Sequence, residues 1–150
     1  MLRWLFAALH LIALGIGLGS IWARALALRG ALNPEGLKRV FYADNIWAVA
    51  GFLWLTTGVA RAFLGFEKGA DYYLHNYFFL AKVGCFLAIV ALEIRPIVAL
   101  MRWRMRLARG EVIDTSPGPA LARTSMVQAF LVLIMILLAT AMARGYGFRA

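Results

Sequence analysis

Charged residues are scarce in this 150-residue chain, and acidic residues are the scarcest. Only 15% of the residues are charged, and seven acidic side chains stand against 16 lysines and arginines, which gives a net charge of +9. Hydrophobic residues make up 63% of the chain, well above the content of a soluble domain. The positive charge therefore indicates anionic lipid head groups as a partner and argues against nucleic acid.

Residues that carry catalytic or metal chemistry are equally few. The single cysteine, Cys85, excludes an internal disulfide and a CxxC metal or redox motif. The sequence has only two histidines, no HExxH motif, no phosphate-binding glycine loop and no Ser-His-Asp arrangement in a supporting context. These absences identify no reaction, and they leave open whether the protein is an enzyme.

Long apolar runs are abundant, and four of them are long enough to cross a membrane. The first run, residues 4–23, is longer than the apolar segment of a typical signal peptide, so it is expected to be a retained span. The sequence predicts a single all-α domain, a four-transmembrane-helix bundle, with spans at about residues 4–26, 44–64, 74–96 and 120–143.

Local signals refine these boundaries. Asn33-Pro34-Glu35 combines a capping residue, a proline at the first helical position and an acid in the first turn, which predicts a helix start. Residues 65–73 are expected to form a loop, and Pro96 is expected to kink the third span before a basic amphipathic segment. A helix-packing seam is predicted from the 4-3-4-3 spacing of Trp47, Gly51, Trp54, Gly58 and Arg61.

The first span carries two patterns. Gly15 and Gly19 form a GxxxG pair, which suits close packing against another helix. An adjacent stripe consists of polar residues and a glycine spaced seven positions apart. At the standard helical rise, His10 lies about 10 Å deeper than Arg3, inside the hydrocarbon. The members of this stripe are Arg3, His10, Gly17 and Arg24.

Basic residues are distributed unevenly between the connections. Ten flank the first and third connections, whereas five lie on the other side of the predicted bundle. The positive-inside rule therefore predicts an inner-membrane protein with both termini in the periplasm and anionic lipid at the cytoplasmic face.

The third span places three titratable residues on one helical face. His75, Lys82 and Glu93 are separated by seven and 11 residues, which brings them within about 20° of one another on a helix. Depth divides this stripe into two layers. The layer near the cytoplasmic boundary is predicted to form structural ion pairs between arginines and acids; its members are Arg24, Asp44, Glu93 and Arg123.

The outer layer is predicted to form a polar pocket on the periplasmic side. Its candidate cofactor-binding residues are His10, Lys82, His75, Arg61 and Arg144. A neutral His10 can ligate a metal, and helical bundles commonly hold haem b through histidine. Lys82 matches the depth of His10 better than His75 does, and an arginine could bind a haem propionate. The alternative is a hydrogen-bonded His10 beside a snorkelling Lys82, with no cofactor.

Several stretches resemble the sequences of one protein family. Over nearly its full length the chain resembles an uncharacterised family of bacterial four-span membrane proteins, domain of unknown function 2214. The resemblance rests on Lys82, EIRP (residues 93–96) and the segments ALHLIALGIGLGSIWAR (8–24), ADNIW (43–47), EKG (67–69), YYLHN (72–76) and ARGYG (143–147). It implies a four-span fold and no defined activity.

More distantly, the His10 span and the Lys82 span resemble the four-helix cytochrome-b-like group that includes CopD and the HemJ type of protoporphyrinogen oxidase. That resemblance implies a haem-binding His10 and an important Lys82.

Three hypotheses of function follow. The first is a haem-b-binding redox protein similar to HemJ or CopD, with His10 and Lys82 at or near the axial positions. The second is a non-catalytic accessory subunit or assembly factor that packs against other membrane-protein subunits. The third is transport of a proton or a metal ion through the pocket formed by His10, Lys82 and His75.

Overall fold

The computed structural model describes residues 1–63 and 70–147. Within these residues the chain is helical and contains no strand. The helices are α1 (Leu2–Arg29), α2 (Pro34–Phe63), α3 (Ala70–Leu74), α4 (Tyr77–Ala108) and α5 (Gly118–Ala143). All except α3 are long and apolar enough to cross a membrane. The protein is therefore an all-α, four-span membrane bundle, as the sequence predicts.

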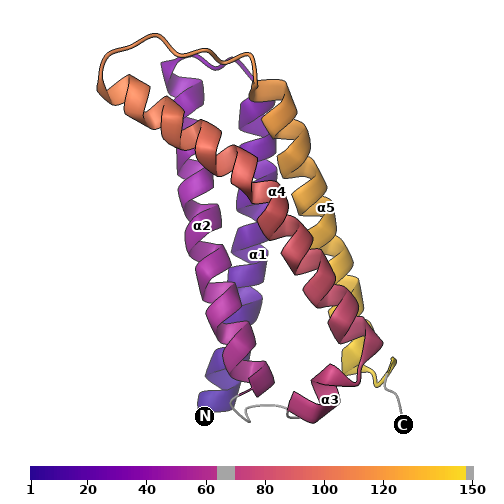
Figure 1. Ribbon diagram of the computed structural model, residues 1–150. Coiled ribbons are helices and arrows are strands. Elements are labelled where there is room, and N and C mark those ends of the chain that lie inside the picture. Colours follow the sequence, from indigo (N-terminus) through magenta and orange to yellow (C-terminus); the bar gives the residue numbers. More distant parts are fainter. Residues whose placement is uncertain (64–69, 148–150) are drawn as a thin grey trace.

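Helix α4 crosses the bundle at a slant, whereas α1, α2 and α5 run alongside one another (Figure 1). α1 packs against α2 and α5, and α5 packs against α4. At the end that carries the loop between α1 and α2, α4 reaches α2, and Leu100 and Trp103 of α4 share a buried cluster with Leu37 and Val40 of α2. Toward the two termini α2 and α4 diverge (Figure 1).

The predicted start of the second helix is confirmed. α2 begins at Pro34, and Asn33 Oδ1 accepts a hydrogen bond of 2.9 Å from the Gly36 N–H. α4 continues through the buried Pro96 to Ala108, so the amphipathic segment belongs to the same helix. Neighbouring helices make such an internal proline tolerable. The expected loop at residues 65–73 lies partly outside the described residues, and its described end forms α3.

The side chain of Arg24 in α1 is completely buried, and it bonds to residues of the other three long helices. Its Nη atoms donate to both Glu93 carboxylate oxygens, at 2.6 and 2.8 Å, and to Asp44 Oδ1 at 2.8 Å. Nε donates to Ser125 Oγ and Nη2 to Gln128 Oε1, both at 3.0 Å. A guanidinium has five N–H donors, and these five bonds use them all.

The two acids of this network are themselves fully engaged. Gln128 Nε2 donates to Glu93 Oε2 at 2.6 Å and to the Ile89 carbonyl at 3.2 Å. Arg104 Nη2 donates to Asp44 Oδ2 at 2.9 Å. The network therefore balances two carboxylates with two arginines, which is what burial within a membrane bundle requires.

The structure brings together three of the four residues predicted to form this ion-pair layer. Arg24, Asp44 and Glu93 are in direct contact, whereas Arg123 is exposed on α5. Arg104 supplies the second positive charge instead. It lies beyond Pro96, on the segment that the sequence predicts to be basic and amphipathic.

Removal of the Arg24 side chain is expected to destabilise the protein strongly. Arg24→Ala leaves Asp44 and Glu93 without their shared cation, and breaking a buried ion pair costs about 3–5 kcal/mol. The measurement is the apparent free energy of unfolding in mixed micelles titrated with a denaturing detergent. Arg123→Ala is the matched control, and it should stay within about 0.5 kcal/mol of wild type because its side chain is exposed. Equal losses in the two variants would contradict the structural role of the network.

Candidate functional site

A cavity of about 400 Å³ lies in the half of the bundle toward the termini. This size falls within the range of about 300–1,000 Å³ typical of small-molecule sites. All five helices contribute to its wall, which is mostly apolar. Its polar and aromatic lining residues are His10, Trp54, Arg61, Tyr72, Tyr73, Phe79, Lys82 and Thr140.

A second space of about 280 Å³ adjoins this cavity between α2 and α4. Both spaces are lined by His10, Trp54, Gly58 and Lys82, so they meet at the same residues. The outer part of the second space is formed by exposed apolar side chains such as Val59 of α2 and Leu87 of α4. The diverging helices α2 and α4 (Figure 1) thus leave a side opening toward the lipid chains.

The hydrogen bonds of His10 assign its tautomer. Thr57 Oγ1 lies 2.6 Å from the Leu53 carbonyl and donates to it, as a hydroxyl in the middle of a helix commonly does. The only hydroxyl proton is thereby used, so Thr57 Oγ1 accepts the proton of His10 Nδ1 at 2.9 Å. Nε2 then carries the lone pair of the neutral ring. A neutral imidazole oriented in this way is a competent metal ligand.

The ring of His10 is also held by its neighbours on α2. It stacks on Trp54, with ring centroids 5.6 Å apart and an interplanar angle of 25°. A Cβ atom on Gly58 would lie 3.1 Å from His10 Cε1, closer than ordinary contact. Glycine at position 58 therefore leaves the space that the imidazole occupies.

Lys82 is the second notable cavity residue. Its side chain is half-buried, and Nζ lies 5.3 Å from the centroid of the Phe79 ring in a cation–π contact. To the described residues it makes neither a hydrogen bond nor an ion pair. The described lining of the cavity also contains Arg61 but no carboxylate. Lys82 would therefore favour an anionic group on a bound ligand.

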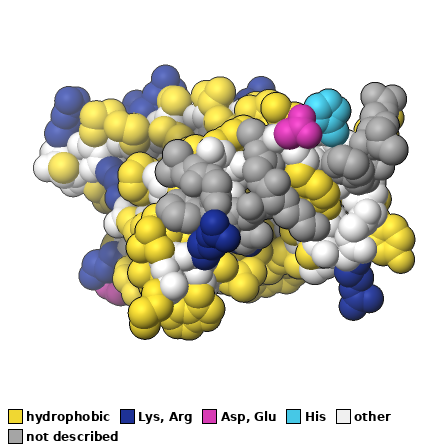
Figure 2. Space-filling model, turned by 90° about the horizontal axis from the view of Figure 1, so that it is seen from below, with side chains coloured by type: hydrophobic (Ala, Val, Ile, Leu, Met, Phe, Trp, Pro, Cys, Tyr) yellow, Lys and Arg dark blue, Asp and Glu magenta, His cyan; other side chains and the backbone are white. Residues whose placement is uncertain are grey.

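The structure gathers His10, Lys82 and Arg61 at the cavity and places the other two predicted residues elsewhere. Arg144 is exposed at the C-cap of α5 and is not part of the lining. His75 lies in the turn before α4, with its side chain 58% exposed and Nδ1 2.9 Å from the Asp71 carbonyl and 3.3 Å from its carboxylate. Figure 2, seen from this end, shows a histidine beside an acidic side chain at the surface, among mostly hydrophobic side chains.

Two residues that shape the site escape the sequence-based prediction. Thr57, which fixes His10, bonds back to its own helix just as Thr56, Thr124 and Thr140 do, so nothing in the sequence singles it out. Trp54 belongs to the predicted packing seam, and its spacing alone gives no sign that it faces an imidazole. Its Nε1 atom is buried and has no hydrogen-bond partner among the described residues.

The comparisons with known proteins give a family and no activity. Residues 2–147 match the family described as a predicted membrane protein, DUF2214. The chain belongs to this family. No curated protein and no solved structure matches it. The distant resemblance to CopD and HemJ has no counterpart in these comparisons and enters only the proposal below.

Two of the segments that resemble DUF2214 proteins meet beside the cavity. Asn76 is completely buried, and its Oδ1 accepts from the Phe78 and Phe79 N–H groups at 3.0 and 3.2 Å, which caps α4. Its Nδ2 donates to the Tyr146 carbonyl at 3.1 Å, and the Tyr77 N–H donates to the Gly147 carbonyl at 2.8 Å. The YYLHN and ARGYG segments are thus joined, and Phe79 is positioned in the cavity wall.

Substitution of Asn76 is expected to lower the free energy of unfolding of the protein. Asn76→Ala removes the helix cap and the bond to Tyr146, with a cost of about 1–2 kcal/mol from the cap alone. The neighbouring His75→Ala serves as the control and should change stability by less than about 0.5 kcal/mol, since His75 is exposed. Detergent-titrated unfolding measures both variants. An Asn76→Ala variant as stable as wild type would show that the contact between the two segments does not depend on this residue.

Proposed function

We propose that the cavity binds haem b through His10 and that the protein is a membrane redox protein. The observation that carries the proposal is the orientation of His10. Thr57 accepts from Nδ1, which leaves the lone pair on Nε2 beside a cavity of ligand size. Imidazole is a common axial ligand of haem iron.

The residues of the cavity fit haem better than they fit a bare metal ion. No group of three or more His, Cys, Asp or Glu side chains lies together in the described part of the chain. A protein metal centre needs about three or four such ligands, whereas haem brings its own ring nitrogens and needs only axial ones. The apolar walls and the side opening between α2 and α4 suit an apolar macrocycle.

Each polar residue of the cavity would have a distinct task. His10 would hold the haem iron, and Lys82 would lie beside it as a second group able to contact the haem. Arg61, which also lines the cavity, would bind a propionate carboxylate. When bound, haem b supplies one-electron redox chemistry. Thr57 holds the tautomer of His10, and the apolar wall excludes water. The resemblance to HemJ and CopD agrees with this assignment.

The absorption spectrum of the protein tests the proposal. Gently purified wild type, produced with ample haem supply, should show a Soret band, and His10→Ala should lose it. Thr57→Val keeps the shape of the side chain but removes the acceptor for Nδ1, and loss of such a supporting contact weakens metal binding by about 10–100-fold.

The controls separate ligand loss from misfolding. His75→Ala, which changes the only other histidine, should keep the Soret band because that side chain lies outside the cavity. Each variant should elute from size-exclusion chromatography as wild type does. A wild-type protein that takes up no haem, or a His10→Ala variant with an unchanged spectrum, would refute haem ligation by His10.

A second candidate function, an accessory subunit or assembly factor, is favoured by the outer face of α1. Gly15 and Gly19 are exposed, and a Cβ atom on either would meet no atom within 4 Å. Among the described residues nothing packs on this GxxxG surface, so it is open to a helix of another protein.

This candidate predicts stoichiometric partners and no cofactor. Gly19→Leu should release a partner that co-purifies with wild type, because the larger side chain keeps two helices apart. Gly84→Leu, on an exposed and equally open position of α4, is the matched control. A protein that purifies alone after mild solubilisation and crosslinking would count against an accessory role.

A further inference from the structure

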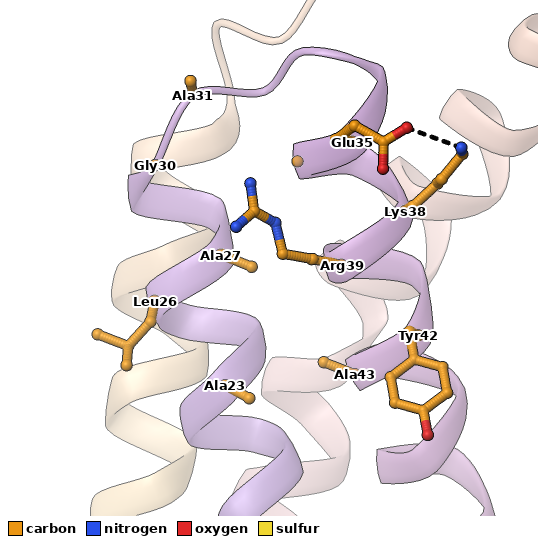
Figure 3. A pocket seen from close by; sticks show the side chains of 11 residues that line it. Ala23, Leu26, Ala27, Gly30, Ala31, Glu35, Lys38, Arg39, Tyr42 and Ala43 are labelled. Atoms are coloured by element: carbon orange, nitrogen blue, oxygen red, sulfur yellow. Dashed lines mark hydrogen bonds and ion pairs between the residues drawn. The ribbon is translucent and has the colours of Figure 1, made fainter.

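We infer that the groove between α1 and α2 is a binding site for one anionic phospholipid, with the lipid phosphate at Arg39. The groove lies at the end of the bundle that carries the loop between these helices, and it has a volume of about 960 Å³ (Figure 3). It is separate from the cavity around His10, with which it shares no residue.

Small residues of α1 create this groove. Ala23, Ala27 and Gly30 line it, so the surface of α1 offers little side-chain bulk opposite α2. On the α2 side, Tyr42 stands at the lower edge of the groove and is 71% exposed. Tyrosine is typical of the level at which lipid head groups meet hydrocarbon, which sets the depth of the groove in the membrane.

The charge of the groove matches a single phosphodiester. Lys38 Nζ pairs with the Glu35 carboxylate at 2.8 Å, so these two lining residues neutralise each other. Arg39 remains as the net positive charge of the lining. In Figure 3 its guanidinium extends from α2 across the groove toward α1. Arginine is suited to phosphate because its planar fork can donate two hydrogen bonds at once.

The groove continues as an apolar channel, which indicates a lipid and not free phosphate. A second depression of about 330 Å³ begins at Tyr42 and follows the same two helices toward the middle of the bundle. Ile12 and Ile16 of α1 face Ile46, Val49 and Leu53 of α2 along it.

The length of the combined surface matches one lipid molecule. Arg39 and Leu53 are 14 positions apart, which corresponds to about 21 Å of helix. This is close to one head-group layer plus half of a hydrocarbon core that is about 30 Å thick. Asn45, which lines the start of the apolar channel, lies at the level where a glycerol ester would need a hydrogen-bond donor.

Native mass spectrometry of the purified protein tests this site. The wild type, equilibrated with mixed vesicles of phosphatidylglycerol and phosphatidylcholine in equal amounts and then washed in mild detergent, should retain one phosphatidylglycerol. Arg39→Ala should bind that lipid about fivefold more weakly, as expected for one basic residue at a membrane surface.

Arg29→Ala is the matched control, because Arg29 is also an exposed arginine at this end of the bundle but does not line the groove. It should keep wild-type retention, which distinguishes a site from general attraction. Val49→Trp, which fills the apolar channel, should reduce retention while Arg39 is intact. Val49 is exposed, so both variants should fold, which thermal unfolding in detergent checks.

Three results would overturn the inference. Equal losses in Arg29→Ala and Arg39→Ala would indicate only diffuse attraction. Unchanged retention in Arg39→Ala would remove the phosphate site. Competition by inorganic phosphate at the lipid's own concentration would show that the apolar channel contributes nothing and that the ligand is a free anion.

Discussion

A single guanidinium held away from water constrains this whole bundle. Arg24 is buried in an apolar protein, so each of its donors must find an acceptor within the protein. Those acceptors come from α2, α4 and α5, and they must lie at one level of the membrane. Buried ion pairs of this kind add little net stability compared with good apolar packing. Their effect here is to select one arrangement of the four helices.

The slant of α4 and the cavity are consequences of two fixed points. At the level of the network, Glu93 and Arg104 hold α4 to α1 and α2. At its other end, Asn76 ties the start of α4 to the turn after α5. Toward the termini, the described residues of α2 and α4 meet through the edge-on rings of Trp54 and Phe86, with no hydrogen bond or ion pair like those at the two fixed points. The two helices separate there, and the space between them becomes the cavity and its side opening.

Sequence alone predicts the fold well because a bilayer leaves few alternatives. Backbone polar groups must be satisfied within each span, so long apolar runs become helices. The depth of each residue along its span also predicts that Arg24, Asp44 and Glu93 lie at one level, and in the structure they are in contact. Arg104 is missed because the segment after Pro96 was read as a basic amphipathic face toward lipid and water, whereas α4 carries this arginine to Asp44 of α2.

The prediction that His75 and Lys82 share one helical face is wrong for a local reason. The third span was expected to begin at residue 74, but α4 begins at Tyr77 because Asn76 caps it. His75 therefore lies outside the helix whose periodicity was used to place it, and it pairs with Asp71 at the surface. A buried asparagine is difficult to recognise as a cap when its partner, the turn after α5, is 70 residues away.

The seven-residue stripe of α1 connects the structural network with the site. Three members of this stripe contact α2. Arg24 pairs with Asp44, and His10 bonds Thr57. Between them Gly17 packs on Trp47, where a Cβ atom on the glycine would lie 3.6 Å from the indole ring. Arg24 and His10 are 14 residues apart, or about 21 Å along the helix. A slip of one residue between α1 and α2 would break the Arg24–Asp44 bond and would also turn His10 away from Thr57. The ion pair at one end of the bundle thus sets the register that orients the imidazole at the other.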